Sequence, residues 1–596
     1  MNLLDSLKSH WLVFTLAVLV AGVYGSHNFL IPEILNRQNQ TYRPVTIASN
    51  IDEGEYYGPR ANAVYHGQLI PGDILVPENA GSPAMLPILN PIIMGYLGRF
   101  LGSLDRAFIV SDFLFPALIF IALYFLAFEL TRKKLLSVFF AVFFIFIPEA
   151  MLYLPPVSGS VFNQLLKNIL PDPNNGLYFL RFEYPKVTYL FYVLTFYFTL
   201  RVIKRQEKWN IWLAGISFGS LFYTYLYDWV YVLFGLLILA VGLIVVKNYQ
   251  KGLSIARIIG IGLLLSIAYW FNFLLLHNLP HYSDLMARIG VEIGRQFRFA
   301  TVWKSYLRNI ALIGLLVLAF WKKEKTIFLY LGSFLVPYFF VVNLQLVLGY
   351  NPHPDHWYRV EFLPIAATFL LLGNWLYEKY VHQVKLKFVS ISALVLIAAI
   401  FGRSLYSEYL FSERNATNFT ISKAYADSYD WLNANAKRGA VVGSINPTTE
   451  VELSLYTGTK IFLLNGFHTT VSDAKIWERL IEISDAYGLT AEQFSSIIKN
   501  SSFVEYLFHN EYRDRSFDSN FRNDDNGRNL SATVISKKIG SYRQFQVSSA
   551  AVIPTDVDYL YFGSRERALV NDLVRFLPNV QKVYDRDGVK IYKIIK

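Results

Sequence analysis

The stretch AFIVSDFLFPALIFIALYFLAFELTRKK (107–134) decides the fold class. Residues 107–128 form an almost uninterrupted apolar run, and Arg132, Lys133 and Lys134 follow it directly. About 20 apolar residues are needed to span the hydrocarbon core of a bilayer as a helix. A short basic segment after such a run is typical of a cytoplasmic loop. We therefore predict a transmembrane helix that ends on the cytoplasmic side.

The same alternation of apolar runs and gaps recurs along the first two thirds of the chain. It predicts eleven transmembrane helices, near residues 11–29, 107–128, 135–154, 187–202, 209–227, 229–246, 256–276, 308–321, 326–348, 360–377 and 388–403. Every second gap is short and rich in Lys and Arg, which indicates the cytoplasm. The N-terminus is then cytoplasmic and, with an odd number of helices, the C-terminus lies outside the cell membrane.

Composition supports a membrane protein and excludes several other classes. Of the 596 residues, 54% are hydrophobic and 17% are charged, whereas soluble proteins carry about 25% charged residues. The net charge of +11 is explained by the basic cytoplasmic loops, so we expect no nucleic-acid partner. The chain has no cysteine, which excludes disulfides and thiolate metal sites.

The domain organisation follows from where the hydropathy falls. We predict a transmembrane domain over 1–403, with a long first outer loop at 30–106, and a soluble extracytoplasmic α/β domain over 404–596. In the second domain, short apolar runs at 439–446, 460–466 and 557–563 are typical of buried strands, and a helical stretch covers 473–511. The sequence 580–595 predicts a hairpin that turns at Asp587 and Gly588.

Two further segments suggest interactions with the bilayer. LMARIGVEIGRQFRF (285–299) has the pattern of a basic amphipathic helix that lies in the membrane interface. The first apolar run follows Lys8 and could be a cleaved signal peptide. It is longer than the usual apolar region of a signal and lacks a clear cleavage site, so we expect a retained helix.

The acidic residues gather on one side of the predicted bilayer. Asp112, Glu149 and Asp228 fall near the outer ends of their helices, Glu183 precedes the fourth helix and Glu361 lies just inside the tenth. Charge within a membrane domain is costly and usually functional. Transporters tend to hold their ion-binding groups near the midplane. The distribution here instead predicts a polar cavity that opens to the outer face.

The strongest local cluster is IDEGEYYGPRANAVYHG (51–67), in the first outer loop. It places Asp52, Glu53 and Glu55 within four residues, ahead of Tyr57 and Arg60. Such carboxylates can deprotonate a hydroxyl nucleophile or hold a divalent cation. A solvated acidic loop is the simpler alternative.

In layout the chain resembles the GT-C superfamily of integral membrane glycosyltransferases. The resemblance rests on a cytoplasmic N-terminus, one helix, and a large outer loop that opens with an Asp-Glu pair; its layout covers roughly residues 1–403 and its specific motif residues 52–57. Members include protein O-mannosyltransferases, aminoarabinose transferases, arabinofuranosyltransferases and oligosaccharyltransferases. The chain lacks the Trp-Trp-Asp motif of oligosaccharyltransferases. The resemblance implies transfer of a sugar from a polyprenyl-phosphate donor to a glycan, lipid or protein acceptor outside the membrane.

The resemblance also suggests roles for individual residues. Asp52 would be the catalytic base, with Glu53 as the second candidate. Glu53 or Glu55 would orient the substrate or hold a divalent cation, Mg²⁺ or Mn²⁺. Arg181 and Arg359 would bind the phosphate, for which Arg is well suited because its fork matches two oxygens. The remaining candidates for substrate binding are Tyr57, Arg60, Glu149, Lys186, Asp228, His353 and His356.

Two alternatives stay open at this point. His353, Asp355 and His356 in HPDHWYR could hold a metal, although the intervening proline argues against a helical ligand pair. The whole chain could also be a non-enzymatic transporter, lipid flippase or envelope assembly protein. In that case acidic residues would line a path across the membrane.

Overall fold

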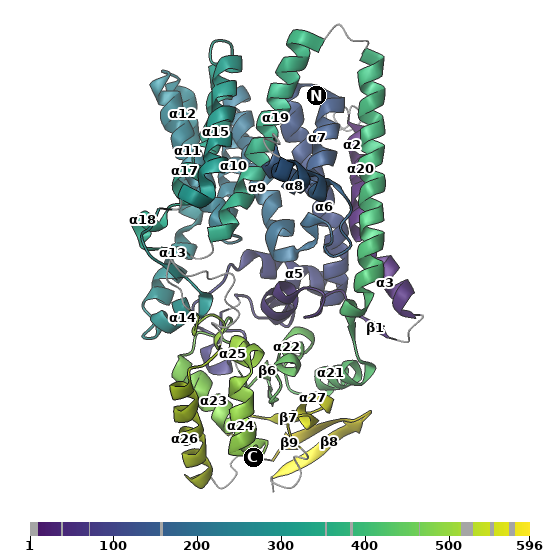
Figure 1. The fold of residues 1–596 in the computed structure, drawn as a ribbon, viewed down its shortest axis with the longest axis vertical. Coiled ribbons are helices and arrows are strands. Elements are labelled where there is room, and N and C mark those ends of the chain that lie inside the picture. The colour runs from purple at the N-terminus through teal and green to yellow at the C-terminus, as the bar shows by residue number, and fades with distance from the viewer. Residues whose placement is uncertain are drawn as a thin grey trace.

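The computed structural model describes residues 10–36, 40–70, 72–154, 159–297, 299–351, 354–381, 386–463, 465–513, 529–548, 554–570 and 579–595. Long helices form a bundle at one end of the molecule, and a smaller unit of helices around a sheet lies at the other (Figure 1). The start of the described chain lies at the far end of the bundle from the sheet (Figure 1).

Helices account for nearly all of the bundle and of the loops that join it. They are α2 (Trp11–Gly25), α3 (His27–Asn36), α4 (Gly58–Tyr65), α5 (Leu89–Leu101), α6 (Leu104–Thr131), α7 (Lys134–Phe146), α8 (Gly159–Ile169), α9 (Thr188–Arg205), α10 (Lys208–Leu221), α11 (Leu226–Val245), α12 (Tyr249–Leu265), α13 (Ile267–His277), α14 (Tyr282–Ile289), α15 (Phe299–Phe320), α16 (Lys325–Leu335), α17 (Tyr338–Val341), α18 (Gln345–Leu348), α19 (Phe362–Leu376) and α20 (Leu386–Asn415). Two-residue strands β1 (Thr41–Tyr42), β2 (Glu292–Ile293), β3 (Tyr350–Asn351) and β4 (Thr420–Ile421) pair as β1–β4 and β2–β3.

Among the described residues, seven helices are long and apolar enough to cross a membrane, and the bent pair α12–α13 makes up to eight. The seven cover Trp11–Asn36, Leu104–Thr131, Tyr184–Arg205, Leu226–Val245, Val302–Phe320, His356–Tyr380 and Ser390–Phe419. The other three predicted segments coincide with α7, α10 and the run from α16 to α18, which are shorter. Each predicted segment is thus helical, while the count of eleven spans stays a prediction.

Several of the predicted basic gaps meet at one end of the bundle. Arg132 and Arg205 both contact Glu129, and Lys133 pairs with Glu378 at 2.9 Å. His10, at the start of the described chain, bonds the Tyr124 hydroxyl at 2.7 Å. The contacts therefore bring the N-terminal end and three basic gaps to the same face, as the predicted topology requires.

The residues after α20 build a five-stranded mixed sheet with the order β6-β5-β7-β9-β8. Its strands are β5 (Val441–Gly443), β6 (Lys460–Ile461), β7 (Tyr559–Phe562), β8 (Val580–Arg586) and β9 (Val589–Ile594). The helices around it are α21 (Lys423–Asn435), α22 (Pro447–Tyr456), α23 (Asp473–Ala486), α24 (Ala491–Lys499), α25 (Ser501–Phe508), α26 (Ala532–Ser548) and α27 (Ser564–Arg567). Asp587 and Gly588 turn the β8–β9 hairpin with positive φ angles of 50° and 79°, which is why this pair predicts a tight hairpin turn.

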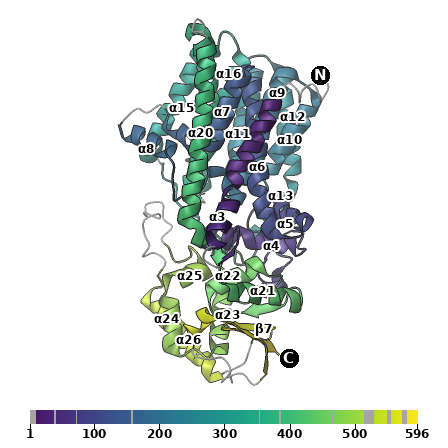
Figure 2. The same ribbon diagram turned by 90° about the vertical axis from the view of Figure 1, so that its right-hand side faces the viewer.

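Two sequence expectations need correction or refinement here. The helix predicted over 285–299 ends at Ile289, because Gly290 adopts a left-handed φ of 83° and closes α14. The segment 292–293 instead forms strand β2. The expected domain boundary at residue 403 falls inside α20, which continues to Asn415 and runs along the bundle toward the sheet (Figures 1 and 2).

Buried polar contacts fasten the C-terminal unit to the bundle. Arg288 of α14 is fully buried and donates to the carbonyl oxygens of Gly466, Thr469 and Val471, and it pairs with Asp473. Similar contacts join the first outer loop to the same region, through Asp73 with Thr469 and Thr470 and through Asn62 with Ser454 and Thr457. The C-terminal unit therefore covers the end of the bundle where the first outer loop lies.

Candidate active site

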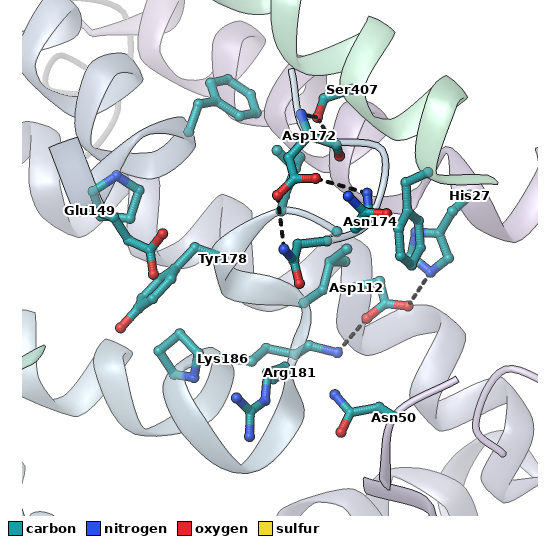
Figure 3. A pocket seen from close by; sticks show the side chains of 18 of the residues that line it. His27, Asn50, Asp112, Glu149, Asp172, Asn174, Tyr178, Arg181, Lys186 and Ser407 are labelled. Atoms are coloured by element: carbon teal, nitrogen blue, oxygen red, sulfur yellow. Dashed lines mark hydrogen bonds and ion pairs between the residues drawn. The ribbon is translucent and has the colours of Figure 1, made fainter. Parts of the chain in front are cut away.

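A cavity of about 420 Å³ lies between the first outer loop, α6, the segment 167–187 and α20. Its lining includes five basic and four acidic side chains, namely Lys167, Arg181, Lys186, Arg359, Arg403, Glu53, Asp112, Glu149 and Asp172. Figure 3 shows Arg181 and Lys186 close to Asp112 and Asn50, with Glu149 and Tyr178 on another wall. The cavity therefore combines groups that can bind an anion with groups that can accept a proton.

The acidic motif starts a π-helical turn, η1 (Asp52–Tyr57). Asn50 precedes this turn, and its side-chain oxygen accepts the backbone N–H groups of Asp52 and Glu53 at 3.1 and 3.3 Å. Gly54 packs so closely on residues 46–47 that an added Cβ would lie 2.6 Å from their backbone. These local contacts fix the direction in which the two carboxylates leave the turn. π-Helical turns occur frequently at functional sites.

The segment that carries Arg181 meets this motif from across the cavity. Arg181 forms an ion pair with Asp52, and the backbone N–H of Phe182 donates to Glu53. Both members of the ion pair are roughly 40% exposed, at 41% and 39%, so they can exchange partners when a substrate binds. The fold thus brings together residues 129 positions apart in the sequence.

Glu53 lies deeper than Asp52 and lines the cavity itself. Burial raises the pKa of Glu53, while Lys186, the Phe182 N–H group and Arg181 oppose that rise. A carboxyl group with a raised pKa holds a proton more firmly, which suits a general base that must take one. Asp52 is not part of the lining, but it pairs with Arg181, which is. Glu53 is therefore at least as well placed as Asp52 to act as the general base.

A buried polar network lies behind this pair, and sequence reasoning missed most of it. Lys186, only 2% exposed, pairs with Asp112, which also lies 3.3 Å from His27 and accepts from Asn28 at 2.9 Å. His27 in turn lies 3.4 Å from Glu408 of α20. The sequence pointed to Asp112 only because it is an ionisable residue near the outer end of a predicted helix. Nothing in the sequence indicated that His27 or Glu408 would join it.

Arg359 occupies an aromatic corner of the cavity. Its guanidinium lies over the rings of Tyr184 and Tyr358, at 5.6 and 5.7 Å from their centroids. Arg359 forms no ion pair within the described ranges. Asp228 and Glu149 interact with it electrostatically from a longer distance. Glu149 lines the cavity, whereas Asp228 is fully buried behind it. A cation that has no carboxylate partner is available to bind a phosphate.

Five predicted substrate contacts lie outside the cavity lining: the fully buried Asp228 and the four residues described next. Arg60 is buried and donates to the Leu86 carbonyl, and Tyr57 packs edge-on against Phe182. Glu55 turns toward the C-terminal unit, where Asn465 donates to it at 2.8 Å. His356 bonds the Tyr225 hydroxyl at 2.5 Å. These four residues support the walls of the site, and their predicted contacts with substrate remain predictions.

The sequence analysis considered a divalent cation bound by acidic or histidine side chains. Within the described ranges, no group of three or more His, Asp or Glu side chains is placed to hold a metal ion. Glu55, one of the two acids expected to orient the substrate or bind Mg²⁺ or Mn²⁺, is bonded to Asn465. His353 lies outside the described residues. The divalent cation therefore stays a prediction.

Glu55 supports a prediction about pH, because burial raises its pKa to about 7. The unfolded chain would release that proton near pH 4.5, so the folded chain holds more protons between about pH 4.5 and about pH 7. Stability is then greatest below that window and falls as the pH rises through it. We expect Glu55→Gln to flatten this fall in a thermal unfolding series from about pH 5 to about pH 8.

The control for this series is Glu413→Gln, which changes an exposed acid on α20. Other carboxyls, including Glu53 and Asp73, also have pKa values raised by desolvation and contribute a fall of the same sign. The difference between the native chain and Glu55→Gln is therefore the quantity to compare. An identical pH dependence in both chains would contradict the role given to Glu55.

Comparison with known proteins returns solved structures only. No protein-family model and no curated protein matches the chain. One similar structure is the arabinofuranosyltransferase AftD from Mycobacteria, with a TM-score of 0.44 and 12% identity over 99% of this chain. The chain spans 40% of the length of AftD. A second is ArnT from Cupriavidus metallidurans bound to undecaprenyl phosphate, with a TM-score of 0.42 and 10% identity over 98% of both chains.

Both likenesses have TM-scores below 0.5, so the residues of the cavity carry the functional argument.

Proposed function

We propose that the protein is an integral membrane glycosyltransferase. It would move a sugar from a polyprenyl-phosphate donor to a hydroxyl group of a glycan, lipid or protein on the outer side of the cell membrane. The observation that supports this best is that Asp52 pairs with Arg181, and Glu53 accepts from the Phe182 N–H group, at a cavity whose lining holds five basic side chains. The acids supply a base, and the basic groups suit a phosphate leaving group.

The proposed reaction is a single displacement with inversion at the sugar. The acceptor oxygen attacks the anomeric carbon as its proton passes to Asp52 or Glu53. The bond between that carbon and the phosphate oxygen breaks, and its electron pair stays on the phosphate. Fixed cations stabilise the charge that develops there. Arg181, Lys186 and Arg359 line the cavity from which they would act.

The position of the cavity agrees with an extracytoplasmic reaction. The predicted cytoplasmic gaps meet at the end of the bundle that holds His10, Arg132 and Lys133. The first outer loop and the C-terminal unit lie at the opposite end (Figure 1). A long carrier lipid could then leave its tail in the bilayer while its phosphate enters the cavity. The C-terminal unit would cover the site on the side of the acceptor.

Arg359 offers a direct test of the donor class. Arg359→Gln should weaken the binding of a polyprenyl phosphate by about 10- to 100-fold, since it removes a charge-assisted contact with the phosphate. The measurement is a lipid titration followed by native mass spectrometry. Arg414→Gln, an exposed arginine on α20, is the matched control and should bind as the native chain does.

The corresponding polyprenol, which has no phosphate, separates headgroup from tail. Its weaker binding should be equal in the native chain and in Arg359→Gln. Native affinity for the polyprenyl phosphate in Arg359→Gln would show that this arginine does not bind the donor. Failure of the native chain to prefer the phosphate over the alcohol would count against the donor class itself.

A further inference from the structure

A second, smaller cavity lies where the first outer loop meets the C-terminal unit. Its volume is about 120 Å³, and residues of α4, of the segments 438–439 and 454–461, and Gln68, Ile74 and Leu75 line it. It shares no lining residue with the larger cavity. Its space corresponds to about four water molecules at about 30 Å³ each, which is enough for a tetrahedral oxyanion.

The ionisable groups that line this cavity are all basic. They are Arg438, Lys460 and His66, and the lining contains no Asp or Glu. Arg99 of α5 approaches the same place: a Cβ added to Gly67 would collide with the Arg438 guanidinium and lie 2.9 Å from that of Arg99. Gly67 has a left-handed φ of 103°, so the loop turns there without a side chain. Two guanidinium groups therefore converge on one glycine.

The carboxylate of Asp73, which acts on one of these cations, already has other hydrogen-bond partners. Asp73 acts on Lys460 through the field, but its own oxygens accept from the backbone or side chains of Leu75, Val76, Thr469 and Thr470. Neither Arg99 nor Arg438 forms an ion pair within the described ranges. The guanidinium groups of Arg99 and Arg438 approach the same point beside Gly67, and like charges that close repel each other. A bound anion would reduce this repulsion.

The cavity also presents hydrogen-bond donors. Gln68 lines it, and its side-chain nitrogen is buried without an acceptor among the described residues. The Gln68 side-chain oxygen accepts from the Lys460 ammonium at 3.4 Å, which leaves the amide nitrogen as a donor. Buried donors normally have a partner. The missing partner here is an acceptor, as an anion would provide.

We propose that this cavity is a binding site for a phosphate group, held by Arg99, Arg438, Lys460 and Gln68. Two guanidinium groups match the oxygens of a phosphate through parallel hydrogen bonds, which favours phosphate over a smaller anion. The phosphate could come from a soluble phosphorylated molecule or from the headgroup of an anionic lipid. The apolar side chains of Leu69, Ile70 and Phe100, which are 64%, 61% and 87% exposed, lie on the same loop and on α5.

The test uses the full-length protein in lipid nanodiscs made of phosphatidylcholine, titrated with inorganic phosphate in a calorimeter. The native chain should bind phosphate. Arg99→Gln together with Arg438→Gln should weaken that binding by about 100-fold, or about tenfold for each guanidinium removed. Both residues are exposed, so the variants should fold. Lys437→Gln removes one positive charge next to Arg438 but outside the lining, and should bind as the native chain does.

Phosphate could also enter the larger cavity, so each titration is repeated in a chain that carries Arg359→Gln. The binding assigned to Arg99 and Arg438 should persist there, which keeps this result independent of the proposed sugar transfer. Nanodiscs that contain phosphatidylglycerol distinguish the source. Loss of the phosphate signal in them identifies a lipid headgroup as the occupant, and an unchanged signal identifies a soluble phosphate group.

Two outcomes would overturn the proposal. One is a native chain that binds no phosphate in phosphatidylcholine nanodiscs. The other is equal phosphate affinity in the native chain and in the double variant.

Discussion

Asp52→Asn combined with Glu53→Gln should lower the rate of sugar transfer by about 10²- to 10⁴-fold, the usual contribution of a general base. Both changes keep the size of the side chain and remove the ability to accept a proton. Asp52 is paired with Arg181 and Glu53 accepts from Phe182, so the amides can retain part of these contacts. The fold should therefore survive while the chemistry is lost.

The measurement is the surface glycan profile of a strain that depends on this protein, complemented with each variant at equal membrane abundance. The single variants decide which acid is the base, because the base variant alone should lose nearly as much as the double variant. Asp427→Asn with Glu413→Gln makes the same two chemical changes at exposed positions and should leave the profile intact. An unchanged profile in Asp52→Asn/Glu53→Gln would instead favour the non-enzymatic alternative.

Lys186→Met should lower the free energy of unfolding by about 3 kcal/mol, because it leaves a buried acid without its main partner. Lys186 and Asp112 are 2% and 9% exposed at their side chains, and they form an ion pair. His27, at 3.3 Å from Asp112, can compensate only in part. Sugar transfer should also fall, since Lys186 lines the cavity in which the phosphate would bind.

Asp112→Asn added to Lys186→Met separates the two effects. Removing both charges of a buried pair is often nearly neutral for stability, so the double variant should regain most of the thermal stability in detergent. Transfer should stay low, because the basic group is still missing. Native stability in Lys186→Met would contradict the buried ion pair, and restored transfer in the double variant would exclude Lys186 from substrate binding.

The sequence by itself determined the long apolar helices and the main strands of the C-terminal sheet. Apolar runs of about 20 residues admit few structures other than a helix, because a chain in lipid must satisfy its own backbone hydrogen bonds. Local sequence also specifies the strands β5, β6 and β7, through short apolar runs. It specifies the hairpin turn through Asp587 and Gly588, which accept a positive φ. The predicted helix over 285–299 failed at one residue, Gly290, whose left-handed φ ends α14.

The acidic motif could be found in the sequence because its residues are neighbours. Asp52 and Glu53 share one turn, and Asn50 fixes that turn from two residues away. Arg181, Lys186 and Arg359 were identified only as basic groups at predicted helix ends. Their place around one cavity depends on how α6, α9 and α19 pack, which no local pattern encodes.

Only the tertiary structure decided which charges meet. His27, Asp112, Lys186 and Glu408 come from four separate segments, and they lie together because burial makes each charge costly unless it finds a partner. The cost of burying a carboxyl group without a partner also explains why Glu55 contacts Asn465 and does not line the predicted site. Hydropathy and turn residues act over a few positions, so their effects can be predicted from the sequence. The pairing of buried charges depends on the whole fold and cannot be predicted in this way.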